Sequence, residues 1–176
     1  MNWTTPKTWQ VDELLTAADL NTHLRDNLNA LKAPPTHAIW RDNGAAYSTT
    51  STAFVPVDSA NLKATLTTNG GDVLVWFWGV FHGDQVGRRV SLDIRVDGVG
   101  RLAAAYNGGL LTHRLSTTIG EEVVLGPVLI SGLSAGEHTF ELLWKVSDGT
   151  ISLHADSDAV NDYDEVPAVL VAREVS

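Results

Sequence analysis

The chain has 176 residues, of which 44% are hydrophobic and 19% are charged, a balance that supports one full core and excludes a largely disordered chain. Its net charge is -9 and its 12 Lys and Arg residues are scattered, so nucleic acid is not an expected partner. The absence of cysteine excludes disulfides, thiolate zinc sites and cysteine nucleophiles.

The first 35 residues contain a helix signal. Thr16 and Asp19 form a capping-box pattern at its start, and the prolines at 34–35 end it near Lys32. Between these limits the leucines fall at spacings of four, four and three, which places Leu20, Leu24, Leu28 and Leu31 on one stripe. We predict one amphipathic helix of about 16 residues.

The leucine stripe needs a surface to cover it. The helix either packs on the β-rich remainder of its own chain or associates with other copies around a symmetry axis, and we favour the second. Asn27 is then expected near the seam, where a polar side chain fixes the register. Trp3 and Trp9 precede the helix and are expected to anchor the chain in a neighbouring protein, because tryptophan is enriched at interface hot spots.

From Ile39 onward the hydrophobic period becomes that of β-strands. We expect strands, two of them weakly signalled, over residues 62–68, 73–82, 90–96, 100–106, 111–115, 123–130, 139–146, 150–155 and 167–175. Residues 69–71 and 134–136 carry turn signals, and residues 126–127 indicate a bulge or a corner. About eight to ten short strands without alternating helices predict an antiparallel sandwich or barrel.

The segment 73–82 is nearly all apolar, which predicts a central strand that is buried on both faces. Trp76 and Trp78 share one of these faces, and Phe77 points to the other. We interpret the two tryptophans as core or subunit-interface residues, with a sugar-stacking face as the alternative. The apolar run is about half the length of a membrane helix, and no apolar leader precedes it, so neither membrane insertion nor a signal peptide is expected.

The sequence offers weak candidates for metal binding, and no cofactor is expected. None of the six histidines has metal-ligand spacing; they are His23, His37, His82, His113, His138 and His154. In a trimer, His82 or His113 could form an axial cluster of three. The densest acidic stretch contains Asp156, Asp158, Asp162 and Asp164. It lacks the order of an EF-hand loop, so a solvated loop is expected and calcium is the alternative.

Catalytic patterns are also weak. No Gly-x-Ser-x-Gly motif is present. Glu121 and Glu122 are the nearest approach to paired carboxylates, but neighbours on one strand point to opposite faces and cannot converge. We therefore expect a protein that is not an enzyme and has no catalytic residues.

The N-terminal segment carries a series of short motifs. They are Thr8-Trp9, Leu15-Thr16-Ala17-Ala18, Leu20-Asn21, Arg25-Asp26-Asn27 and Leu31. This series resembles a segment common in phage tail and fibre proteins, in which a tryptophan-containing lead-in precedes a capped helix. One departure is Asp12-Glu13, where a Gly-Glu pair is frequent in that family.

The C-terminal half carries a second series of motifs, found at residues 133–140, at Trp144, at residues 149–153 and at residues 171–175. It resembles the jelly-roll head of the tumour necrosis factor and complement-type globular family, in its phage version. The resemblance implies a ten-stranded jelly roll that trimerises about a three-fold axis and serves assembly and surface binding.

These resemblances imply an antiparallel jelly-roll β-sandwich head over residues 36–176, preceded by an N-terminal attachment segment with one α-helix over residues 1–35. The expected function is that of a homotrimeric bacteriophage virion protein, either a tail fibre or minor tail component or a capsid decoration. Its partners are sister copies and other virion proteins. It is made in the host cytoplasm and reaches the exterior by lysis. The alternative is a receptor- or carbohydrate-binding module at a fibre tip that binds a host surface glycan.

Overall fold

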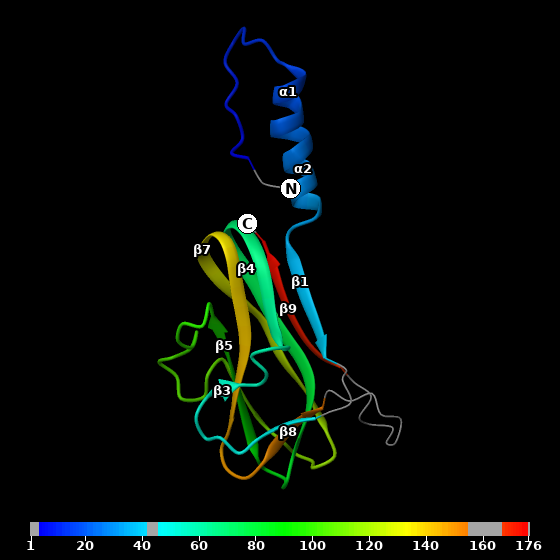
Figure 1. The fold of residues 1–176 in the computed structure, drawn as a ribbon, viewed down its shortest axis with the longest axis vertical. Helices are drawn as coiled ribbons and strands as arrows, with labels where there is room; N and C mark the ends of the chain where they lie inside the picture. The colour runs from blue at the N-terminus through cyan, green and yellow to red at the C-terminus, as the bar shows by residue number, and fades with distance from the viewer. Residues whose placement is uncertain (1–3, 42–45, 155–166, 176) are drawn as a thin grey trace.

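The computed structural model describes residues 4–41, 46–154 and 167–175. Its helical segment runs continuously through α1 (Ala17–Leu20), the π-helical turn η1 (Asn21–Asp26) and α2 (Asn27–Lys32). The predicted capping box is present, since the backbone N–H of Asp19 donates to Thr16 Oγ1 at 3.1 Å and the Asp19 carboxylate accepts from the Thr16 backbone. The helix stands beyond one end of the β-structured body (Figure 1).

The described residues form nine strands, which lie in one hydrogen-bonded system. They are β1 (Thr36–Arg41), β2 (Tyr47–Thr49), β3 (Val55–Pro56), β4 (Lys63–Gly83), β5 (Arg89–Val96), β6 (Leu111–Arg114), β7 (Glu121–Val146), β8 (Ile151–His154) and β9 (Ala168–Glu174). Every pairing between them is antiparallel.

Strands β4 and β7 pair along almost their whole length, and each contributes to two layers. In the first layer, residues 73–83 of β4 and 121–130 of β7 join β8, β9 and β1. In the second layer, residues 63–69 of β4 and 133–146 of β7 join β3, β5 and β6. The sandwich therefore has two hydrogen-bonded layers, and β4 and β7 contribute residues to both of them.

The two predicted turns at 69–71 and 134–136 do not reverse the chain. They lie opposite one another inside β4 and β7, where Asn69 pairs with Ala135, and they mark the bend between the layers. Gly70 and Gly71 have φ values of 94° and 133°, a region that glycine adopts without the Cβ penalty of other residues. The bulge predicted at residues 126–127 is confirmed by a register shift on the ladder.

One hydrophobic core fills the space between the layers. Phe77 and Phe81 of the first layer and Trp144 of the second are buried, and the Phe81 and Trp144 ring centroids are 6.2 Å apart. The predicted jelly-roll β-sandwich with one N-terminal helical segment is confirmed. The weakly signalled strand at 100–106 is wrong, because these residues form a loop that lies over β5. None of the described helices is long and apolar enough to span a bilayer.

Candidate functional site

The outward side of the first layer carries a row of apolar side chains. The strand register places Trp40 beside Val169, Val169 beside Trp78, and Trp78 beside Val124. Residues that pair directly across antiparallel strands point to the same face of the sheet. Trp40 and Val124 are 65% and 54% exposed, so this row of four apolar residues ends in solvent on both sides.

Two further rows lie next to the first, on the side toward the helix. One contains Ala38, Val171 and Trp76, and the other contains Leu74 and Leu129 on either side of the β4–β7 ladder. We call these rows together the open face. Its residues are Ala38, Trp40, Leu74, Trp76, Trp78, Val124 and Leu129, together with Val169 and Val171, which are buried among them at 8% and 7% exposure.

The prediction that residues 73–82 are buried on both sides is wrong for a single chain. Val73, Val75 and Phe77 are fully buried in the core, whereas Trp76 and Trp78 on the other side are only partly buried. The core covers one side of β4, whereas on the other side Leu74, Trp76 and Trp78 are only partly buried and Val80 alone is buried, at 8% exposure. A strand whose composition suits burial on two sides is thus left with one side open.

The helical segment also carries apolar side chains that are left exposed. Leu20, Leu24, Leu28 and Leu31 are between 41% and 65% exposed, so the leucine stripe does not pack on the sandwich of its own chain. Within the described residues the sandwich therefore does not cover the stripe, and its packing on other copies stays a prediction.

A groove of about 620 Å³ joins the leucine stripe to the open face. Ala30 and Leu31 line it on the helix side, and Leu74 and Trp76 line it on the sheet side. At its edge the buried Glu174 carboxylate accepts hydrogen bonds from the backbone N–H and the side-chain amide of Asn69, at 2.7 and 2.9 Å. The apolar surface is therefore continuous from helix to sheet.

The segment before the helix folds back on it and uses Asn27. The Asn27 amide accepts from the Thr4 backbone N–H at 2.9 Å and donates to the Thr4 carbonyl at 2.8 Å, and the side chain is 5% exposed. Asn27 thus ties down the lead-in, and its register role at an interhelical seam stays a prediction. Trp9 packs edge-on against His23 with ring centroids 6.1 Å apart, while Trp3 lies outside the described residues.

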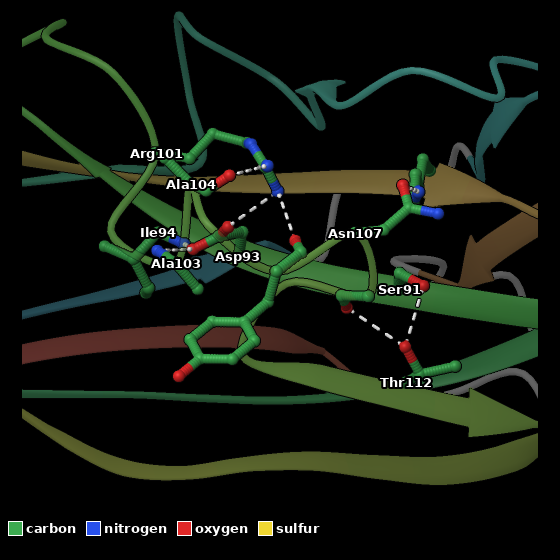
Figure 2. A network of polar contacts seen from close by, with 11 residues as sticks. Ser91, Asp93, Ile94, Arg101, Ala103, Ala104, Asn107 and Thr112 are labelled. Carbon is green, nitrogen blue, oxygen red and sulfur yellow. Dashed lines mark hydrogen bonds and ion pairs between the residues drawn. The ribbon is translucent and has the colours of Figure 1, made fainter.

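The second layer has a different outer face, because its own chain covers it (Figure 2). The Asp93 side chain on β5 is fully buried and accepts hydrogen bonds from the backbone N–H groups of Ile94 and Ala103, at 2.8 and 3.2 Å. Arg101 donates to the other Asp93 oxygen at 3.1 Å and also to the Ala104 carbonyl. We call the loop of residues 97–110 the clasp, since these bonds hold it on β5.

The clasp is held at further points. Arg101 lies over the Phe54 ring at 4.3 Å, and Lys145 lies 5.1 Å from the same ring. At the start of the clasp, the Asp97 carboxylate contacts His138 Nδ1 at 2.7 Å. Sequence reasoning missed this network, because Asp93 had the position of an ordinary outward residue on an alternating strand.

The other predicted candidates are dispersed. Glu121 binds His113 at 2.9 Å and accepts from Ser116 and Thr117; partial burial raises the pKa of Glu121, but these hydrogen bonds outweigh it and lower the pKa to about 2. Glu122 is exposed, so the pair does not converge. The described residues contain no cluster of three or more metal-binding side chains, and the acidic stretch with Asp156, Asp158, Asp162 and Asp164 lies outside them.

The chain matches no protein-family model and no curated protein sequence. Among solved structures it is similar to Eiger TNF from S. frugiperda, with 11% identity, a TM-score of 0.45, and coverage of 82% of this chain and 95% of that one. It is also similar to the infectious bursal disease virus Gt strain (16% identity, TM-score 0.41) and to the VP2 subviral particle of that virus (15%, 0.36). The match covers 81% of this chain but only 38% of either viral chain. These likenesses are weak, and the fold assignment rests on the strand pairing.

Proposed function

We propose that this chain is a non-enzymatic structural protein of a bacteriophage particle, that it forms a homotrimer, and that residues 1–35 attach it to other virion proteins while the jelly-roll head is displayed. The observation that carries the proposal is the open face, which continues through the groove into the leucine stripe. Exposed, contiguous apolar patches mark interaction sites on soluble proteins.

Association would cover both apolar surfaces at once. A stable interface buries on the order of 1,200–2,000 Å² in total, and roughly 25 cal/mol is gained per Å² of apolar area, most of it offset by the cost of ordering two molecules. A helix of about 16 residues is marginal in water by itself, so packing against sister helices would stabilise it. The supports for three copies and for a phage particle are the two motif series at the ends of the chain.

The decisive experiment measures the mass of the full chain in solution by light scattering. We expect three times the chain mass of 18.9 kDa. Val124→Lys places a charge on the open face and should give a monomer with an unchanged far-ultraviolet circular dichroism spectrum. Val99→Lys is the matched control, because Val99 is 79% exposed but lies on the clasp, and this variant should stay trimeric. A wild-type chain that is monomeric at every concentration contradicts the proposal.

A second candidate function is a receptor- or carbohydrate-binding module at a fibre tip, and the clasp favours it. Val99, Leu102 and Tyr106 are exposed on the clasp, on the layer opposite the open face, so they would stay accessible in a trimer. Trp76 and Trp78 would not, since they lie on the open face. A glycan array probed with wild-type protein and with Tyr106→Ala tests this candidate.

A further inference from the structure

One lateral side of the sandwich brings an edge strand of each layer together. Strand β1 is the outer edge of the first layer, because it pairs with β9 alone among the described strands (Figure 1). Residues 63–69 of β4 form an edge of the second layer, because among the described strands they pair with β7 alone. One side chain joins the two edges, since the Thr65 backbone N–H on β4 donates to Nδ1 of His37 on β1 at 2.8 Å.

The position of His37 follows from the strand register. His37 pairs with the fully buried Ala172, so its ring points inward, toward the second layer. Successive N–H groups of a strand point to opposite sides, and that of Thr65 points away from β7. Farther along β4, the N–H of Asn69 is bound by the Glu174 carboxylate of β9 in the same way. Side chains of the first layer thus supply acceptors to an edge that would otherwise offer its donors to another strand.

The hydrogen bond fixes the protonation state of His37. A backbone N–H group can only donate, so Nδ1 of His37 accepts through its lone pair and carries no proton. The ring is therefore neutral, with its hydrogen on Nε2. A proton added to Nδ1 would convert the acceptor into a donor that faces another donor, so this contact cannot exist in the imidazolium form.

The charged groups near His37 do not replace this contact. They are Arg41 on β1, Arg173 and Glu174 on β9, Lys63 on β4, and Glu137 and Glu141 on β7. Glu174 points to the same side as His37, but its carboxylate accepts from Asn69. Among the described residues His37 forms no ion pair, and the bond from Thr65 is its one polar contact.

We propose that His37 is a pH-sensitive latch between the two layers, closed when its ring is neutral and open when its ring is protonated. Histidine is the side chain whose charge ordinarily changes between about pH 8 and pH 5. In acid, β1 loses this bond to the second layer, and the Thr65 N–H becomes available to another strand. Because β1 is the first strand after the helical segment, opening loosens the joint between that segment and the head.

The test follows the Thr65 amide of the full chain by hydrogen exchange, with each rate divided by the intrinsic rate at the same pH. In the wild type, protection of this amide should be about tenfold lower at pH 5 than at pH 8. His37→Asn is the matched variant, because its amide oxygen can accept in place of Nδ1 and does not titrate, so protection should be equal at both pH values. His37→Leu should give low protection at both. His113→Gln is the control and should keep the wild-type pH dependence, because His113 contacts Glu121 instead.

Wild-type protein with ¹⁵N-labelled histidine provides a readout that needs no variant to fold. Nδ1 of His37 should be unprotonated at about pH 8, and both of its ring nitrogens should be protonated at about pH 5. A protonated Nδ1 at the higher pH, equal Thr65 protection at both pH values in the wild type, or the same acid-dependent loss in His37→Asn would each overturn the proposal. Both partners belong to one chain, so monomeric Val124→Lys should keep the pH dependence, which separates the latch from the trimer test.

Discussion

The outer faces of the two layers of the sandwich differ in how far the chain itself covers them. On the second layer, the chain covers β5 with its own clasp, and the buried Asp93 carboxylate is matched by Arg101 and two backbone N–H groups. On the first layer, the outer side of β4 carries Trp76 and Trp78 and receives no such cover from the described residues.

This difference indicates which kind of contact each outer face can form. A buried carboxylate needs hydrogen-bond donors at fixed positions, and a loop of the same chain supplies them at no cost in association entropy. An apolar face is stabilised when water is excluded from it, and a second copy of the chain can exclude this water with its own open face and helix. The clasp is therefore a folding feature, whereas the open face suits assembly.

The largest effect is expected from Asp93→Ala, which removes the acceptor at the centre of the clasp. Arg101 and two backbone donors lose their partner, so the free energy of unfolding should fall by about 3 kcal/mol, measured by urea denaturation. Asp148→Ala is the control, because the Asp148 side chain is 67% exposed, and it should change stability by less than about 0.5 kcal/mol. If Asp93→Ala also lost the trimer, the assignment of separate roles to the two layers would be wrong.

A smaller effect on the free energy of unfolding is expected when acid protonates Glu121. This residue links the start of β7 in the first layer to His113 on β6 in the second. Its pKa of about 2 lies below the ordinary 4.5, so its contribution is present above pH 4.5 and is lost as the pH falls toward 2. Allowing for solvent screening, we expect about 1–2 kcal/mol.

The measurement compares urea denaturation of wild type and Glu121→Gln between about pH 6 and pH 2.5, a range set by the linkage of this carboxyl. The free energy of unfolding of Glu121→Gln should fall less over this pH range than that of the wild type, because the variant lacks the contribution of the Glu121 carboxylate. Glu122→Gln, at the exposed neighbour, should follow the wild-type curve. Parallel curves for the wild type and Glu121→Gln would show that the link between layers is not stabilising.

The smallest effect is expected at His138, whose hydrogen bond to Asp97 holds the start of the clasp and raises the pKa of the imidazole above its ordinary 6.5. Stability from this pair is fully present below pH 6.5 and is lost as the pH rises through the raised value. We expect the free energy of unfolding, measured by urea denaturation, to fall by about 0.5–1 kcal/mol over this rise in pH, and we expect no such fall in His138→Gln. A wild-type stability that rises over this interval would contradict the assignment.

The parts of the fold that depend on near neighbours could be predicted from the sequence. The capping box of Thr16 and Asp19 is a local pair of hydrogen bonds, and the sides of β4 follow from its alternation. The bend at residues 69–71 could not be predicted, because whether a glycine pair reverses the chain depends on its pairing with residues more than 60 positions away.

The candidate sites show the same limit. The tryptophans of β4 were interpreted as core or subunit-interface residues, because the sequence alone does not say whether the chain itself or another copy covers them. Asp93 and Arg101 are only eight residues apart, but their contact depends on how the clasp closes over β5. His82 and His154 carry no spacing signal at all, because their meeting is a product of the sheet register.

The sharing of β4 and β7 between the layers has a mechanical consequence. A pull on the helix would enter the head at Thr36, and the six registered pairs of β1 and β9 would carry it in shear. From β9 the tension passes to β4, whose backbone continues through the bend into the opposite layer. Neither layer can be peeled away alone, so a head tethered at its N-terminal end resists force as one body.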